Sequence, residues 1–276
     1  MNGYLFYLLK AGLIVLGISA LQACQQSPDS KDYFPLEKGL KWHYRVSEQR
    51  VGREWRDQEQ EYPFSIENLG EIALGGEYAD QDVSVRRTSD DTEYYILKND
   101  DGVYRIGKRT QVELKPRFDP EMRTIIPIAA IQAAATGASL TSTAIEELGS
   151  ENEAFAVKNR GLHWYLETQP YLLHATSSHS LPDPKERRFN LAFDVISTAA
   201  EVRVPAGTFK NCIQIQGKGA ISFYADPRIG YQEVIITQTE WYAPGVGLVK
   251  LIREEPLHLE MYKGGRIYFE LTRFEG

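Results

Sequence analysis

The chain has 276 residues, of which 42% are hydrophobic and 25% charged, the composition of a folded globular protein rather than a disordered one. Its 38 acidic side chains outnumber the 31 basic ones and give a net charge of −7. This balance argues against nucleic acid and an anionic membrane surface as partners, because both bind clustered Lys and Arg.

The first feature along the chain is an apolar run, residues 11–20, preceded by Lys10. The run is too short to span a bilayer and is typical of a secretory signal. It leads into Leu21-Gln-Ala-Cys24, which resembles a bacterial lipobox. The resemblance implies cleavage before Cys24 and acylation of that residue, so that the chain is held in the membrane by lipid. A soluble secreted protein with an ordinary signal peptide is the alternative.

The predicted domain organisation follows from that cleavage site. Residues 1–23 form the signal peptide, 24–32 a lipidated tether and 33–276 a single β domain. The mature chain keeps 253 residues, with 30 basic and 38 acidic side chains and a net charge of −8. Gln25 follows the cysteine, which in enterobacteria-like sorting implies the outer membrane, with the domain facing the periplasm.

Alternation of apolar and polar residues recurs through the domain and indicates half-buried strands. Asn99-Asp-Asp-Gly102, Pro244-Gly245 and Lys263-Gly-Gly265 predict the turns of three hairpins. Many short strands with polar outer faces predict a mainly β fold, a curved antiparallel sheet or incomplete barrel with one or two short helices. The main predicted strands cover residues 40–46, 94–97, 103–106, 187–198, 233–243, 246–253, 257–262 and 266–274.

An Ala-rich insertion near residues 125–150 breaks this pattern. Because Ala favours helix, the predicted helices lie between Ala129 and Leu148, with an interruption near Gly137. Three roles fit the composition: a helix packed across an open face of the sheet, a lid over a lipophilic cavity, or a disordered or partner-binding insertion.

The histidines do not form a convincing metal site. His174 and His179, with Asp183, lie on a predicted loop and lack the spacing of a zinc motif, so no metal is expected. His43 and His163 sit in alternating stretches beside tryptophans and are interpreted as surface imidazoles.

Catalytic motifs are equally lacking. The sequence contains no nucleophile elbow, P-loop or dinucleotide fingerprint. The adjacent acids at positions 90–91 and 254–255 are interpreted as solvated turns. Cys212 lies in an alternating stretch and, with Cys24 acylated, has no partner; a buried, inert thiol is expected. We therefore predict no enzyme activity, no catalytic residue and no cofactor.

Two motifs have the pattern of a strand, a tight turn and a strand. In Val204-Pro-Ala-Gly-Thr-Phe-Lys-Asn-Cys212 the proline fixes φ and the glycine permits positive φ. In Trp241-Tyr-Ala-Pro-Gly-Val-Gly-Leu-Val-Lys250 the glycines suit a turn rather than a phosphate loop, because no helix follows. Trp241 itself is expected to be buried.

Together with the opening Phe34-Pro-Leu-Glu-Lys-Gly-Leu-Lys-Trp42, these motifs resemble a widespread group of bacterial envelope proteins without assigned activity, many of them lipoproteins and several TapB-like. The resemblance covers the opening and residues 201–253 and implies no catalytic or binding residue.

Two functions are compatible with these features. A curled sheet with a concave apolar face suits a binding or carrier module for a hydrophobic ligand, a fold-level analogy to LolA/LolB-type carriers. The alternative is a structural or accessory subunit of an envelope assembly, which docks a protein by a sheet edge or an aromatic patch. The expected partners are thus the membrane through Cys24 and either a hydrophobic molecule or an envelope protein.

Overall fold

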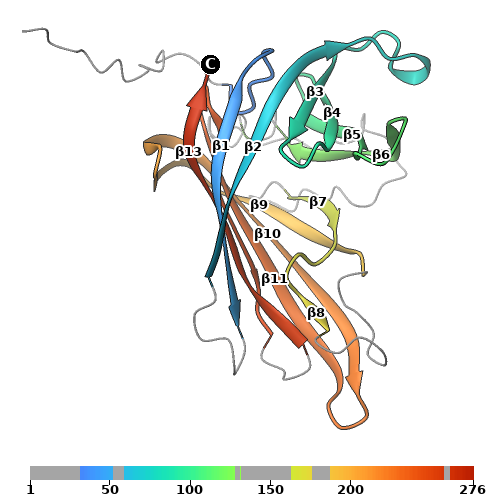
Figure 1. Cartoon of the computed structure of the whole chain (residues 1–276), viewed down its shortest axis with the longest axis vertical. Helices are drawn as coiled ribbons and strands as arrows, with labels where there is room; N and C mark the ends of the chain where they lie inside the picture. The colour runs from blue at the N-terminus through green and yellow to red at the C-terminus, as the bar shows by residue number, and fades with distance from the viewer. Residues whose placement is uncertain (1–31, 52–58, 128–130, 132–162, 176–186, 258–261) are drawn as a thin grey trace, which may run out of the picture. The chain divides into compact units, whose positions relative to one another are not determined.

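The computed structural model describes residues 32–51, 59–127, 131, 163–175, 187–257 and 262–276 (Figure 1). Cys24, with the predicted signal peptide and all of the tether except its last residue, lies outside them. So do the predicted helices of the Ala-rich insertion, with the exception of Ile131. That side chain is buried, and its amide donates to the carbonyl of Pro127 at 3.1 Å.

Within the described residues thirteen strands form one antiparallel sheet, in the order β6-β5-β4-β3-β2-β1-β13-β12-β11-β10-β9-β7, and β8 pairs with β13 off this path. A 3-10 turn, η1 (Gly76–Tyr78), precedes β3. The strands are β1 (Lys41–Val51), β2 (Glu59–Ile72), β3 (Val83–Thr88), β4 (Glu93–Lys98), β5 (Val103–Arg109), β6 (Arg117–Ile126), β7 (His163–Thr168), β8 (His174–Ala175), β9 (Phe189–Val204), β10 (Gly207–Asp226), β11 (Gly230–Ala243), β12 (Gly247–Glu255) and β13 (Tyr262–Glu275).

The sheet is strongly twisted and open (Figure 1). Its two edge strands, β6 and β7, do not pair with each other in the described part of the chain. The Arg123 side chain of β6 nevertheless donates to the carbonyl of Glu167 in β7 at 3.0 Å and to its carboxylate at 3.1 Å. The prediction of a mainly β fold built on a curved antiparallel sheet is confirmed, and the sheet does not close into a barrel.

Local sequence explains most of these strands. Trp42, Tyr44 and Val46 alternate along β1 and are all buried. The Asn99 side chain accepts hydrogen bonds from the amides of Asp101 and Gly102, each at 3.0 Å, and fixes the predicted turn between β4 and β5.

No helix of the described residues is long and apolar enough to cross a membrane.

The turn predicted around Gly264 and Gly265 is wrong, because β13 continues through both residues. A Cβ on Gly264 would lie 2.2 Å from the carbonyl oxygen of Glu255, and one on Gly265 would lie 2.1 Å from that of Gln49. These glycines therefore allow β13 to pack closely against the strands on either side.

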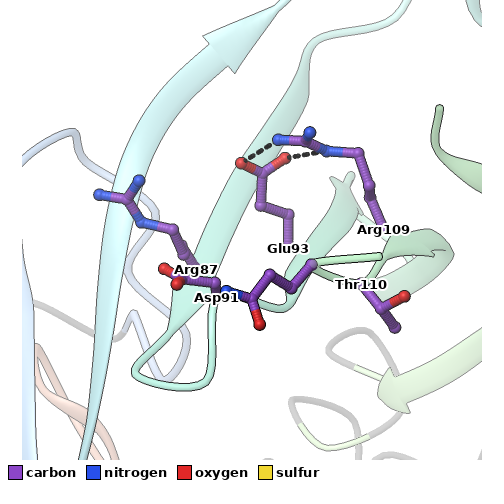
Figure 2. A pocket seen from close by; sticks show the side chains of 6 residues that line it. Arg87, Asp91, Glu93, Arg109 and Thr110 are labelled. Atoms are coloured by element: carbon purple, nitrogen blue, oxygen red, sulfur yellow. Dashed lines mark hydrogen bonds and ion pairs between the residues drawn. The ribbon is translucent and has the colours of Figure 1, made fainter. Parts of the chain in front are cut away.

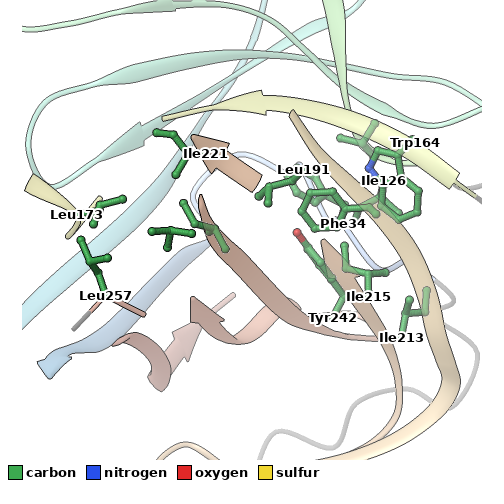
Figure 3. Close-up of a cluster of buried hydrophobic side chains, with 14 of the residues drawn as sticks. Phe34, Ile126, Trp164, Leu173, Leu191, Ile213, Ile215, Ile221, Tyr242 and Leu257 are labelled. Carbon is green, nitrogen blue, oxygen red and sulfur yellow. The ribbon is translucent and has the colours of Figure 1, made fainter. Parts of the chain in front are cut away.

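The largest core fills the concave face of the sheet, where aromatic and aliphatic side chains of β7, β9, β10 and β11 meet Phe34 and Ile126 (Figure 3). A second core, the turn cluster, lies beside the turns that join β9 to β10 and β11 to β12. Its buried members are Trp42, Tyr44, Val202, Val204, Cys212, Ala243, Val246, Val249 and Leu271.

Candidate functional site

The three sequence motifs meet in the turn cluster. The Trp42 indole donates to the carbonyl of Val246 at 2.6 Å, so the opening motif is tied to the β11–β12 turn. Gly247 has φ +89°, and a Cβ there would lie 3.3 Å from Pro35. The Tyr33 hydroxyl donates to the carbonyl of Asn211 at 3.1 Å. These contacts serve packing and turn geometry.

Cys212 is fully buried in the same cluster, and burial raises the pKa of its thiol to about 11. The expected burial of this thiol is confirmed, and its inertness stays a prediction. Trp241, expected to be buried, is only partly so, whereas the neighbouring Tyr242 and Ala243 are buried. The register of β11 points Tyr242 into the concave core instead.

The amino-terminal segment, residues 32–39, is fastened to the sheet at several points. The Asp32 carbonyl accepts the Gly245 amide at 2.7 Å, and its carboxylate pairs with Lys98 at 2.6 Å. The guanidinium of Arg86 lies 4.2 Å from the ring centre of Phe34 and donates to the carbonyl of Pro35 at 2.9 Å. Burial lowers the pKa of Arg86 to about 10. The chain therefore enters the domain at a fixed place, beside the β11–β12 turn.

A buried polar chain crosses the concave face on β11 and β12. It consists of Gln238, Glu240, Tyr242, Arg253 and Glu255. Arg253 donates to Glu255 at 2.6 Å and to the Gln238 oxygen at 2.8 Å. The Gln238 amide donates to Glu240 at 2.5 Å, and the Tyr242 hydroxyl donates to the other Glu240 oxygen. Burial raises the pKa of Glu240, against the opposing effect of these two donors.

One end of this chain fastens the segment between β7 and β8. The Glu255 carboxylate accepts the amides of Tyr171, Leu172 and Leu173 at 2.7–3.0 Å. Arg253 lies 3.9 Å from the ring centre of Tyr171. Protein groups satisfy these charges, and the arrangement holds a loop in place.

The interpretation of residues 254–255 as a solvated turn is wrong, because both lie in β12 and Glu255 is fully buried. Glu254 points outward and pairs with Arg266 at 2.7 Å. The same interpretation is confirmed for Asp90 and Asp91, both exposed between β3 and β4. Sequence alone gave no sign of the inward carboxylate, since its amide partners lie more than 80 residues away.

Of the predicted surface imidazoles, His43 is confirmed: its ring lies 3.1 Å from Glu275 and 3.2 Å from Arg273, at the surface. His179 and Asp183 lie outside the described residues, and the side chains of His163 and His174 do too. In the described part of the chain no group of three His, Cys, Asp or Glu is placed to hold a metal. The expected lack of enzyme activity stays a prediction.

Two depressions of the described surface are open and lined largely by charged side chains. One, of about 220 Å³, lies between Arg87, Glu93 and Arg109 (Figure 2). The other, of about 680 Å³, lies beside Asp32, Lys38 and Lys98. Neither is an enclosed apolar cavity of the kind that hydrophobic ligands occupy.

An exposed apolar surface with an aromatic pair belongs to the projecting hairpin, residues 219–236 of β10 and β11. Tyr224 and Tyr231 face each other across the two strands with ring centres 5.3 Å apart, and Tyr231 is 75% exposed. Ile229 at the tip and Ile235 on the same outer face as Tyr231 are also exposed. The sequence analysis did not single out these residues; alternation predicted a strand but not which face meets solvent.

Within the described residues, each strand of the projecting hairpin has an edge without a neighbouring strand, although the Arg187 side chain donates to the carbonyl of Ser222 in β10 at 2.8 Å. Pairing of β10 with β9 ends at Lys218, and pairing of β11 with β12 begins at Thr237. Beyond those residues the two strands pair with each other and with no other described strand. An open edge next to an aromatic face is a surface on which another chain can add a strand.

No protein-family model matches the chain, and no curated protein matches it. Two solved structures are similar. A candidate lipoprotein from Parabacteroides distasonis is 12% identical, with 90% of this chain and 100% of that chain covered and a TM-score of 0.40. A candidate exported protein with a YmcC-like fold from Bacteroides fragilis is 12% identical, with 88% and 98% covered and a TM-score of 0.36. Likeness of this degree carries no argument about activity.

Proposed function

We propose that this chain is a lipid-anchored accessory subunit of the bacterial cell envelope, which docks a partner protein through its projecting hairpin. The lipobox-like Leu21–Cys24 supports the anchor. The exposed Tyr224–Tyr231 pair on a hairpin with open edges carries the docking proposal. The resemblance of the sequence motifs to TapB-like envelope lipoproteins is compatible with both parts.

The position of the hairpin favours this role. Asp32 contacts Gly245 at one end of β11, whereas Tyr231 lies at the other end of the same strand. A strand of 14 residues spans about 45 Å at roughly 3.3 Å per residue. A domain held by its amino-terminal end therefore presents the hairpin tip far from the point of attachment.

The chemistry of the hairpin defines the partner. Tyrosine combines a large apolar ring with a hydroxyl that stays hydrated, which suits interfaces that form between folded proteins. We expect a protein with an apolar groove for Tyr231 and Ile235 and an extended segment that pairs with an open edge.

This role is favoured over the carrier role because side chains fill the concave face where the structure describes it (Figure 3). The carrier role stays a prediction, and native mass spectrometry of the protein purified from its host tests it. A lipid retained at fixed stoichiometry would restore the carrier role; a mass without ligand agrees with docking.

A photo-crosslinking amino acid in place of Tyr231 tests docking in living cells. The matched control places the same amino acid at Tyr165 of β7, another exposed tyrosine. We expect one discrete adduct from position 231, absent from position 165 and lost when Ile235→Ser is added. Adducts of the same pattern from both positions, or none from position 231, would refute the proposal.

The anchor is tested separately by the change Cys24→Ser. We expect this change to abolish labelling by radioactive palmitate and to leave the signal peptide uncut. Labelling that persists in the variant would exclude Cys24 as the acylated residue.

A further inference from the structure

A second exposed apolar feature lies on the β5–β6 hairpin. The connecting turn, residues 110–115, which we call the finger, carries Val112 and Leu114 with 89% and 97% of their surfaces exposed. These are the largest values among the exposed large hydrophobic residues of the described part of the chain. Isolated exposed aliphatic residues are common, but two on one short turn call for an explanation.

The finger is held in shape by its own polar groups. The Glu113 carboxylate accepts the amide and the hydroxyl of Thr110, both at 2.9 Å, and the Glu113 amide donates to the Thr110 carbonyl at 3.0 Å. Below the turn, Arg109 forms a two-bond pair with Glu93 at 2.6 and 3.0 Å (Figure 2). The two aliphatic side chains therefore project from a turn that is stabilised by its own hydrogen bonds.

The surroundings of the finger are basic in an acidic protein. Residues 105–123 contain six basic and three acidic side chains in a chain of net charge −7. Two of the basic ones, Arg109 and Arg123, are paired with acids outside this range, Glu93 and Glu167. Asp119 pairs with Arg105 at 3.4 Å and Arg123 at 3.3 Å. Lys115 and Arg117, which flank the turn, are exposed and form no ion pair within the described residues.

We propose that the finger is a second membrane contact, in which Val112 and Leu114 enter the interface of an anionic bilayer and Lys115 and Arg117 face its headgroups. Exposed aliphatic side chains followed directly by exposed basic ones suit such a surface, because burial of apolar area and attraction to anionic lipid act together. The net charge of the whole chain argued against an anionic membrane as a partner. A net charge does not show where basic residues gather, and Lys115 and Arg117 lie together beside the finger.

This inference rests on the proposed anchor, which keeps a bilayer within reach of the finger. Once the chain is tethered, contact by the finger is intramolecular and needs little affinity of its own. The hairpin that docks a protein in the proposed function takes no part in it.

The test uses a single thiol in the mature acylated protein. Cys24 is acylated and Cys212 is buried, so Val112→Cys offers the only accessible thiol for a fluorophore that brightens in lipid. The labelled protein is reconstituted into phosphatidylcholine vesicles with and without phosphatidylglycerol. Tyr231→Cys, labelled in the same way, is the control.

With phosphatidylglycerol we expect lipid-borne quenchers to reduce the Val112 signal about twofold and to leave the Tyr231 signal unchanged. The changes Lys115→Gln and Arg117→Gln should each lower the ratio of inserted to free finger about fivefold. Equal quenching in vesicles without anionic lipid, or none with it, would overturn the inference. Failure of the anchor itself is distinguishable, because the protein would then not float with the vesicles.

Discussion

Strands β11 and β12 pass through two regions that are built on opposite principles. Beside their connecting turn they supply Ala243, Val246 and Val249 to the turn cluster, which apolar, aromatic and glycine residues hold together. Farther along, the same strands supply the buried polar chain that ends in Arg253 and Glu255. The first region remains stable when some of its apolar contacts are lost. The stability of the second region depends on every buried charge keeping its partner.

The largest expected effect comes from cutting the buried polar chain. Glu255→Ala leaves Arg253 and three backbone amides without their acceptor, so we expect a loss of about 4–5 kcal/mol in the free energy of unfolding. Urea denaturation of the mature protein measures it. The control is Glu254→Ala, which removes an exposed ion pair from the adjacent position and should cost less than about 1 kcal/mol. Equal losses would mean that Glu255 is hydrated in solution.

Trp42→Ala tests the turn cluster. The indole is 2% exposed and hydrogen-bonded to Val246, so we expect a loss of about 3–4 kcal/mol in the same denaturation experiment. Trp241→Ala should cost about half as much, because this side chain is only partly buried. The reverse order would show that the cluster centres on Trp241 instead.

Gly247→Ala tests backbone geometry in the turn cluster. A residue with a Cβ is strained at φ +89°, and the new methyl group would meet Pro35, so we expect a loss of about 1–2 kcal/mol. Gly75→Ala is the control, since Gly75 has φ −90° and open space around its Cβ position. The thermal midpoints of the two variants give the comparison; an unshifted Gly247 variant would contradict it.

The smallest effect is a change in pH dependence. The pKa of Glu240 is raised in the folded protein, so the folded state binds the proton of this carboxyl more tightly than the unfolded state does. The stability that this proton contributes is lost as the pH rises above about 4.5 towards the pKa of the folded state. Glu240→Gln cannot titrate and should flatten the stability profile above about pH 4.5. Unfolding curves across this range check the prediction, which fails if both profiles have the same slope.

These two regions also differ in how far the sequence predicts them. Alternation and turn residues predicted β1 and the β11–β12 turn, because such signals lie within a few neighbouring residues. Gly264 was mistaken for a turn residue because its close neighbour, Glu255, belongs to another strand. Burial of Glu255 was missed for the same reason: the amides that stabilise it come from residues 171–173.

The exposed candidate sites were predictable only in part. The sequence analysis named an aromatic patch or a sheet edge as a docking surface, but it did not identify Tyr224 and Tyr231. Which face of a strand meets solvent depends on what covers the sheet, and pairing between distant strands decides that. The finger was hidden because its positive charge is outweighed elsewhere in the chain.

The fastening of residues 32–39 has a mechanical consequence for a protein held by its amino-terminal end. A pull on that end reaches Asp32 first, where the Gly245 amide and Lys98 resist it, and then Pro35, which Arg86 holds. The force is thus shared among three parts of the sheet before it reaches β1 at Lys41. Strand β1 is therefore shielded from being peeled off the sheet one hydrogen bond at a time.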